Sequence, residues 1–259
     1  MSLEGRVAVV TGGGMGIGEG IARELAAAGA AVVVSDVNDD AGEQSASKLK
    51  EAGARAMYVH CDSSNEDEVK GLIEAAVREF GKLDVMVNNA AIGVYKSVTE
   101  ATVEEFDLAL AVNLRGPFLG MKHAAAPMRE AGGGSIINIA SVHSVQNVGG
   151  TAPYAASKGG VAALTRAAAI DLASDNIRVN AICPGWTDTP LVRGIFDAAD
   201  DPEAARKEVE DRQLLKRLGT PKDIGQAAVF LAGDNSSYMT GSLVFVDNGM
   251  TAQLEVFPE

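Results

Sequence analysis

Two polar side chains near the middle of the chain have the type and spacing needed for proton transfer. Tyr154 is followed four residues later by Lys158, and Ser141 lies thirteen residues before Tyr154. On a helix, residues four apart share one face, so the phenol and the ammonium are predicted to lie together. A nearby cation favours the phenolate, and lowering a tyrosine pKa from about 10 to about 7 takes roughly 4 kcal/mol. A tyrosine tuned in this way accepts a proton from an alcohol.

The same pair also has an ordinary interpretation, in which Tyr154 is a helix-face aromatic and Lys158 is its solvated partner. A tyrosine and a lysine at this spacing occur often by chance, so the pair alone does not identify a function. A second group of residues, near the N-terminus, shifts the balance.

The N-terminal segment predicts a phosphate-binding turn. An apolar strand over 6–10 leads into the sequence TGGGMGIG at 11–18, and an amphipathic helix follows from about 19 to 28. Glycines let the backbone pass close to a pyrophosphate, and a helix start offers free N–H groups and the positive end of its dipole. The spacing differs from the common G-x-G-x-x-G pattern, and the alternative is a flexible glycine-rich turn.

Asp36 is expected to select the dinucleotide. It ends a second apolar strand over 31–35 and lies eighteen residues after Gly18. A dinucleotide-binding fold places there the carboxylate that binds the adenosine ribose hydroxyls. A carboxylate repels a 2′-phosphate, and none of the neighbours Gly13, Gly14 and Val37 is a cation. The sequence therefore predicts NAD rather than NADP.

Apolar runs that alternate with helical patterns predict the fold class. Further strands, with helices between them, are expected over 54–61, 83–87, 135–139, 177–183 and 242–246. This order predicts an α/β fold of the Rossmann type, with a doubly wound parallel sheet and helices on both faces. A length of 259 residues with 47% hydrophobic content suffices for a single domain over 1–259, and no linker is evident.

Charge and composition argue against several classes of protein. A formal net charge of -13 argues against binding to nucleic acid or to anionic membranes, because both need basic patches. The longest small or apolar run, 26–34, is too short to cross a bilayer, and the N-terminus lacks the pattern of a signal peptide. Cys61, Cys183 and the three histidines have no ligand-like spacing, so reduced thiols and no metal site are expected. We expect a soluble cytoplasmic protein.

In combination these motifs resemble those of the classical short-chain dehydrogenase/reductase (SDR) family. The resemblance covers 11–249 and rests on four ordered motifs, namely the glycine motif at 11–18, NNAA at 88–91, the tetrad Asn113, Ser141, Tyr154 and Lys158, and Pro184-Gly185. It implies an oxidoreductase that transfers a hydride between NAD and a secondary alcohol or ketone.

The resemblance also implies a role for each tetrad residue. Tyr154 is the general acid/base, Lys158 lowers its pKa and holds the nicotinamide ribose, and Ser141 orients the substrate oxygen. Asn113 bends its helix and holds a water that links Lys158 to solvent. Taken by itself, an asparagine within a helical segment is usually exposed or satisfied locally.

The family pattern places the cofactor against a long set of residues. Asp62 is expected near the adenine amino group, although a turn or helix-start role suits it almost equally, and the Thr187 backbone and the Thr189 hydroxyl are expected to hold the carboxamide. The full set is Gly12, Gly14, Met15, Gly16, Ile17, Gly18, Asp36, Val37, Cys61, Asp62, Asn89, Ala90, Ala91, Tyr154, Lys158, Pro184, Gly185, Thr187 and Thr189.

The predicted substrate pocket consists of Ser141, His143, Gln146, Tyr154 and Trp186. Two local segments, 141–143 and 183–186, resemble the 3-hydroxybutyrate dehydrogenases, which hold a substrate carboxylate with glutamine, histidine and lysine. Gly93 and Thr151 stand at the glutamine and lysine positions here, and a lone histidine is more often structural, so specificity for a short hydroxy acid is in doubt.

Two larger features follow from the family. The polar segment 188–215 corresponds to a mobile substrate lid, although its charges also fit a solvated helix face. The helix after Tyr154 is rich in small residues, which relatives use with the helix near 105–130 to form subunit contacts; part of that pattern reflects packing on the sheet. A homotetramer is expected.

Three functions compete. The first is an NAD-dependent dehydrogenase of a small secondary alcohol such as a polyol, sugar or steroid. The second is a 3-oxoacyl-carrier-protein reductase, which Asp36 and the acidic charge disfavour. The third, from another class, is a non-catalytic nicotinamide-binding regulator, which the presence of Ser141, Tyr154 and Lys158 disfavours.

Overall fold

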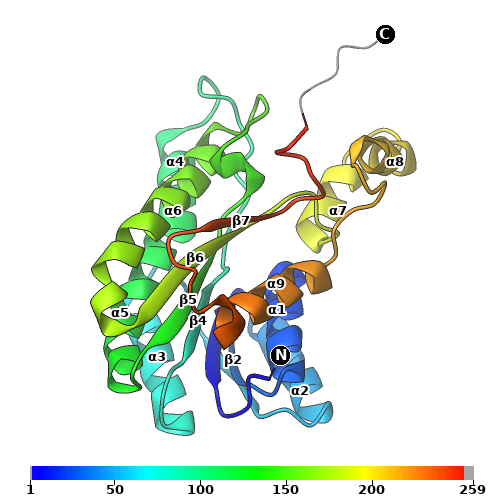
Figure 1. Ribbon diagram of the computed structural model, residues 1–259. Helices are drawn as coiled ribbons and strands as arrows, with labels where there is room; N and C mark the ends of the chain where they lie inside the picture. Colours follow the sequence, from blue (N-terminus) through cyan, green and yellow to red (C-terminus); the bar gives the residue numbers. More distant parts are fainter. Residues whose placement is uncertain (1, 254–259) are drawn as a thin grey trace.

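The apolar runs predicted as strands lie side by side in one parallel sheet in the computed structural model, which describes residues 2–253 (Figure 1). Residue 1 and residues 254–259 of the predicted domain lie outside that range. Over the described residues the sheet has seven strands in the order β3-β2-β1-β4-β5-β6-β7. They are β1 (Val7–Thr11), β2 (Ala31–Asp36), β3 (Ala56–His60), β4 (Val85–Asn88), β5 (Gly134–Ile139), β6 (Ile177–Pro184) and β7 (Leu243–Val246). The predicted parallel α/β fold is confirmed.

Helices connect the strands and cover both faces of the sheet (Figure 1). They are α1 (Gly16–Ala27), α2 (Asp39–Glu51), α3 (Glu66–Phe80), α4 (Val103–Leu110), α5 (Gly116–Glu130), α6 (Ala152–Asp171), α7 (Pro190–Asp197), α8 (Pro202–Arg212) and α9 (Pro221–Ala232). A π-helical turn, Ala111–Arg115, joins α4 to α5. The predicted lid segment 188–215 contains α7 and α8.

Successive strand residues point to opposite faces of the sheet and so enter two separate cores. Ala8 and Val10 of β1 pack with α1, α2 and α9, whereas Val9 packs with α3, α5 and α6. Both sets of helices are therefore held by the same short strands, which explains why these strands read as continuous apolar runs rather than as alternating ones.

The strand order reverses next to β1. The chain moves outward from β1 to β2 and β3, and then returns to the other side of β1 with β4. In a doubly wound sheet the loops after two such strands diverge and leave a crevice at the carboxyl ends, where ligands bind. The predicted glycine turn follows β1, and the NNAA motif includes the end of β4, so both lie at this crevice.

Candidate active site

A cavity of about 910 Å³ opens at the carboxyl ends of the strands. Its lining extends from the glycine turn and Asp36 at one end to Ser141, Tyr154 and Lys158 at the other. Most of the predicted cofactor and substrate residues therefore share one continuous space. The exceptions are Gly14, Asn113 and Gln146, which do not belong to the lining.

The glycine turn has a shape that side chains would prevent. Gly12 and Gly16 adopt left-handed backbone conformations with φ of 61° and 57°. A Cβ atom on Gly18 would overlap the carbonyl oxygen of Gly12. The turn and the start of α1 are thus packed against each other with no room for larger residues.

The start of α1 lacks the side-chain cap found on other helices. Asn38, Asn65 and Thr102 cap α2, α3 and α4 by accepting backbone N–H groups, whereas Met15 at the start of α1 makes no such bond. The first N–H groups of α1 therefore remain available to an anion, and the positive end of the helix dipole favours one. This arrangement fits the pyrophosphate of a dinucleotide.

Asn89 holds the glycine turn in place through its side-chain amide. Its side-chain amide donates to the carbonyl oxygens of Thr11 and Gly12, each at 2.9 Å. The Thr11 hydroxyl in return accepts the backbone N–H groups of Asn89 at 3.0 Å and of Ala90 at 3.2 Å. The ends of β1 and β4 are joined by this network, so Asn89 holds the glycine turn in place through backbone contacts.

Asp36 is held in one orientation by two backbone groups. One carboxylate oxygen accepts the N–H of Gly14 at 3.0 Å, and the other accepts the N–H of Asn38 at 3.1 Å. Gly14 lies outside the cavity lining but reaches the site through this bond. Val37, beside Asp36, is exposed and lines the cavity.

Asp62 and Cys61 lie where the resemblance places the adenine. The Asp62 carboxylate accepts both the backbone N–H and the hydroxyl of Ser64 at 2.8 Å, while Asn65 caps α3. Asp62 thus stabilises the turn before α3 and also lines the cavity. The two interpretations of this residue are compatible. Cys61 is buried, and burial raises the pKa of its thiol to about 12.

Tyr154 and Ser141 come from different elements and meet in the cavity. Tyr154 lies in the first turn of α6, and Ser141 follows β5. Burial raises the pKa of the Tyr154 phenol above its ordinary value, and the nearby Tyr95 adds to the rise, while a hydrogen bond with the Ser141 side chain opposes it. The phenol is therefore protonated at neutral pH in this structure. The predicted lowering of its pKa by Lys158 needs correction, because burial dominates and Lys158 is not among the groups that shift this pKa.

Lys158 shares a face with Tyr154 but contacts it less directly than the spacing predicts. Its ammonium lies 5.7 Å from the centre of the Tyr154 ring and donates to the carbonyl oxygen of Ile139 at 2.8 Å. The long lysine side chain reaches past the ring to the end of β5. Lys158 is almost completely buried, which lowers the pKa of its ammonium to about 8.

Asn113 lies at the centre of the π-helical turn and is fully buried. Its carbonyl oxygen accepts the N–H of Ile92 at 2.8 Å, and its amide nitrogen donates to the carbonyl oxygen of Ile92 at 2.9 Å and to the hydroxyl of Ser157 at 3.1 Å. The helix is locally distorted here, and Asn113 ties the loop after β4 to α6. It lies behind the cavity wall.

The segment after β6 forms the far wall of the cavity through Pro184, Gly185, Trp186, Thr187 and Thr189. The Thr189 hydroxyl accepts the N–H of Val192 at 3.3 Å and so caps α7. The Thr187 hydroxyl donates to the carbonyl oxygen of Gly185 at 3.1 Å. Both threonines predicted to hold the carboxamide lie on the wall, and Thr189 also caps the start of α7.

The structure brings two of the distinctive substrate-side residues to the cavity and leaves one outside it. The His143 ring meets the Tyr154 ring edge-on at 5.7 Å between centroids, and Trp186 stacks on Phe196 of α7. Gln146 is exposed, and its amide donates to the carbonyl oxygen of Thr251 at 3.4 Å. The predicted place of Gln146 in the pocket therefore needs correction, because the loop turns its side chain toward the C-terminal segment.

Sequence reasoning missed most of the apolar lining. The cavity also contains Ile92, Tyr95, Val112, Val148, Leu191, Val192, Ile195 and Met250. Tyr95 follows β4, and residues after the carboxyl end of a parallel strand are candidates for ligand contact, so its position could have been flagged. Met250 comes from a distant segment and carries no such signal.

Two further observations concern the described part of the chain. Among residues 2–253, no group of histidine, cysteine, aspartate and glutamate side chains has the arrangement of a metal site. None of the helices in this range has the length and apolar character needed to span a bilayer.

Comparisons with known proteins agree with this architecture. A family model described as enoyl-(acyl carrier protein) reductase matches residues 12–251. The chain is 42% identical over 248 residues to the cis-4-hydroxycyclohexanecarboxylate dehydrogenase of Sinomonas cyclohexanicum, with 95% of this chain and 97% of that protein covered. It is 39% identical over 247 residues to the cyclopentanol dehydrogenase of Comamonas testosteroni, with the same 95% and 97% covered.

A solved structure of 7α-hydroxysteroid dehydrogenase, complexed with NADH and 7-oxo glycochenodeoxycholic acid, is also similar. It matches with a TM-score of 0.90 at 34% identity, covering 96% of this chain and 95% of that chain. All of these matches extend over nearly the full length of both partners.

Proposed function

Because the chain belongs to the short-chain dehydrogenase/reductase family, we propose that it is an NAD-dependent dehydrogenase of cyclic, largely apolar secondary alcohols. The chain is an oxidoreductase that transfers a hydride between a nicotinamide cofactor and a CH–OH group. We propose three details of this activity, namely the choice of NAD, the roles of the site residues and the class of alcohol.

The observation that carries the proposal is one cavity that joins an uncapped helix start, a fixed carboxylate and a tyrosine–serine pair. The nicotinamide cofactor, when bound, supplies the hydride acceptor or donor. The start of α1 holds the pyrophosphate, Asp36 binds the adenosine ribose, Lys158 holds the nicotinamide ribose, and Thr187 and Thr189 hold the carboxamide.

Charge supports NAD over NADP. Of the described residues that line the cavity, Lys158 is the only lysine or arginine, and it lies at the end opposite Asp36. A 2′-phosphate beside Asp36 would meet a carboxylate and no compensating cation, so it would be repelled.

Tyr154 moves the proton. In the reducing direction its phenol, kept protonated by burial, gives a proton to the oxygen of the ketone while the carbonyl carbon gains the hydride. Oxidation requires the phenolate form of Tyr154, which takes the hydroxyl proton as the carbinol carbon loses the hydride, so this direction is favoured as the pH rises. Ser141 donates a hydrogen bond to the same substrate oxygen and holds it beside Tyr154.

The class of alcohol follows from the lining on the substrate side. Val148, Leu191, Ile195 and Met250 are apolar and line the cavity. The two relatives described above are named for alcohols on five- and six-membered rings. An apolar wall of this kind favours a carbocyclic alcohol over a sugar or a polyol, whose hydroxyl groups would be left without partners.

The helical segment 188–215 is proposed as the lid over this site. Leu191, Val192 and Ile195 of α7 line the cavity. Asp188 binds Arg193 of α7 at 2.6 Å and Arg206 of α8 at 3.3 Å, so one carboxylate links the two helices to each other.

The test measures NADH formation with cyclohexanol as the substrate. The wild type is expected to turn over with NAD, whereas Tyr154→Phe is expected to lose turnover by a factor of about 100 or more and still quench NADH fluorescence on binding. Retained turnover in the Phe variant would remove Tyr154 as the acid/base. Equal or better use of glycerol or glucose would remove the carbocyclic class.

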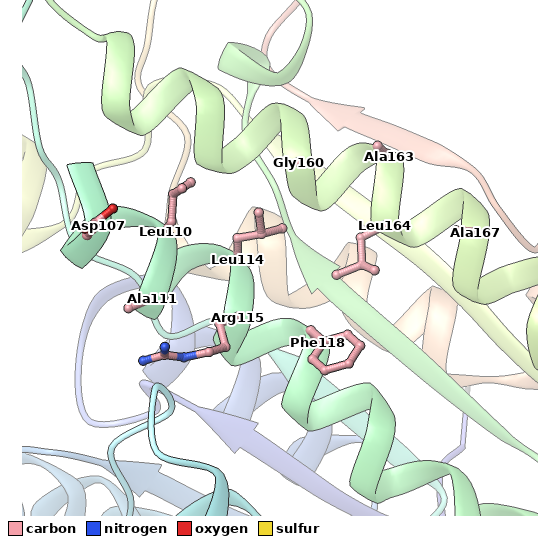
Figure 2. Close-up of a pocket in the computed structure, with 10 residues that line it drawn as sticks. All are labelled: Asp107, Leu110, Ala111, Leu114, Arg115, Phe118, Gly160, Ala163, Leu164 and Ala167. Atoms are coloured by element: carbon pink, nitrogen blue, oxygen red, sulfur yellow. The ribbon is translucent and has the colours of Figure 1, made fainter. Parts of the chain in front are cut away.

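The homotetramer is proposed from the family, with one of its interfaces at a groove on the outer side of α4, α5 and α6 (Figure 2). Figure 2 shows Leu114 and Phe118 beside the small residues Gly160, Ala163 and Ala167 of α6. The groove measures about 820 Å³, and Phe118 is 47% exposed within it. A second copy of the same helices would cover this apolar face, and sedimentation of Phe118→Arg is expected to show a smaller assembly than the wild type.

We also propose a cytoplasmic location. Cys61 and Cys183 are both buried and free rather than joined in a disulfide, as is usual for a protein of a reducing compartment.

A further inference from the structure

Tyr95 lies on the loop after β4, and backbone contacts hold this loop on both sides of it. Before Tyr95, the side chain of Asn113 binds both the N–H and the carbonyl oxygen of Ile92, at 2.8 and 2.9 Å. After Tyr95, the carbonyl oxygen of Lys96 accepts the N–H of Ala152 at 3.0 Å. The position of the Tyr95 backbone is therefore fixed relative to α6, which carries the acid/base.

The Tyr95 ring lies against the reacting tyrosine. Its centroid is 5.3 Å from that of Tyr154, with the ring planes tilted by 52°. Tyr95 also lines the cavity and is 40% exposed, so one side of its ring faces the space where the substrate binds. A substrate whose oxygen meets Tyr154 therefore binds in a space that the Tyr95 ring also lines.

Gly93 makes room for this ring. A Cβ atom at position 93 would lie 2.6 Å from Cε2 and 3.0 Å from Cζ of Tyr95. The backbone of Gly93 is outside the left-handed region, so its conformation suits any residue. Residue 93 is therefore a glycine because the Tyr95 ring needs the space, and not because the backbone is strained.

The hydroxyl of Tyr95 does not fix the ring. Within residues 2–253 it makes no hydrogen bond, and burial raises the pKa of the phenol, which keeps it neutral. Tyr95 therefore contacts a substrate through its aromatic ring and not through a charge.

We propose that Tyr95 sets the ring size of the alcohols that the enzyme accepts, with Gly93 keeping its ring in place. The inference rests on the proposed function, since it concerns the fit of a carbocyclic substrate beside Tyr154. The Tyr95 ring limits the cavity next to the carbinol carbon, admits five- and six-membered rings, and excludes fused bicyclic ones.

The experiment compares kcat/KM for cyclopentanol, cyclohexanol and decahydro-2-naphthol. In Tyr95→Ala the ratio of bicyclic to monocyclic kcat/KM is expected to rise about tenfold or more, because removing the ring opens space for additional methylene groups. Tyr95→Phe is expected to restore the wild-type ratio. Tyr238→Ala, which alters a fully exposed tyrosine, is the matched control and should keep that ratio.

Gly93 supplies an independent variant. Gly93→Ala is expected to displace the Tyr95 ring and change the substrate ratio, whereas the same substitution in the Tyr95→Ala background should change it little. Equal effects of Gly93→Ala in both backgrounds would overturn the link between the two residues.

The outcomes separate the two proposals. If the wild type oxidises the monocyclic alcohols and Tyr95→Ala lowers kcat for all substrates by the same factor, Tyr95 only supports Tyr154 and the inference fails while the proposed function stands. If the wild type oxidises none of the alcohols and binds NADH, the proposed substrate class fails first.

Discussion

The ammonium of Lys158 lies 5.7 Å from the centre of the Tyr154 ring and donates its 2.8 Å hydrogen bond to the carbonyl oxygen of Ile139. The cation is thus placed beside the phenol rather than directly on its oxygen. Lys158 is only 2% exposed, so this arrangement keeps an ionisable group in a poorly solvated place. Such burial has a measurable effect on stability.

The stability contributed by Lys158 should depend on pH. Burial lowers its pKa to about 8 from an ordinary value of 10.5. Below about pH 8 both folded and unfolded chains hold the proton, and the folded state bears the cost of the buried charge. Between about pH 8 and 10.5 the unfolded chain binds more protons, so stability rises with pH. The difference of about 2.5 pKa units corresponds to about 3 kcal/mol.

Urea unfolding of the wild type and of Lys158→Met at about pH 7 and about pH 11 would measure this effect. The free energy of unfolding of the wild type is expected to gain about 3 kcal/mol relative to the variant as the pH rises. The other lysines, the tyrosines and Cys61 titrate in both proteins, so their contributions cancel, whereas Cys183 interacts with the Lys158 charge and contributes to the difference. Parallel pH curves would show that the Lys158 charge is better solvated than its burial indicates.

Removing the Asp36 carboxylate should weaken the discrimination between the two dinucleotides. In Asp36→Ala the ratio of kcat/KM with NAD to that with NADP is expected to fall about tenfold or more, because a repulsion and a ribose contact are lost together. Asp39→Ala is the control. The Asp39 carboxylate is bound by Tyr58 at 2.6 Å and His60 at 2.8 Å and lies outside the cavity lining. A wild type that prefers NADP would contradict the assignment of Asp36.

Glycines at two helix positions should respond in opposite ways to alanine. A Cβ on Gly18 would overlap the carbonyl of Gly12, so Gly18→Ala is expected to weaken NADH binding at least about tenfold and to lower Tm. Gly71, inside α3, has nothing within 4 Å of an added Cβ. Gly71→Ala should raise stability by up to about 1 kcal/mol and leave NADH affinity unchanged. Titrations of NADH fluorescence and thermal melts measure both, and equal behaviour of the two variants would refute the close packing of the turn.

The proposed lid should loosen when its link to Asp188 is cut. Arg206→Gln is expected to raise KM for the alcohol about threefold to fivefold with little change in Tm, because an exposed ion pair contributes below about 1 kcal/mol. Among residues 2–253, Arg212 on the same helix forms an ion pair with Glu208 alone, at 2.6 Å. Arg212→Gln should leave KM at the wild-type value. If both variants change KM equally, the effect belongs to surface charge and not to the link.

Local spacing explains what the sequence predicted well. Tyr154 and Lys158 share a helical face because they lie four residues apart, and Asp36 ends β2, the strand that pairs with the one before the glycine turn. Helix bounds were less accurate. The first helix starts at Gly16, three residues before its predicted start, because the last glycines of the motif already belong to α1.

Contacts between distant segments explain what the sequence did not predict. Met250 reaches the cavity from beyond β7, and Gln146 turns toward Thr251, so both depend on how the C-terminal segment packs. Neither position follows from a local pattern. The segment around Asn113 was predicted to be helical, but its π-helical turn depends on the pairing of Asn113 with the Ile92 backbone.

The π-helical turn sets the orientation of two groups of side chains about one helix axis. Asn113 is buried and donates to Ser157 of α6, while Leu114 and Phe118, just downstream, lie in the outer groove (Figure 2). Deleting one residue from the turn would rotate everything after it by about 100° about the helix axis. The amide would then leave its partners at the same moment as the apolar groove lost its lining. This single rotation of the helix would therefore reduce both turnover and subunit assembly.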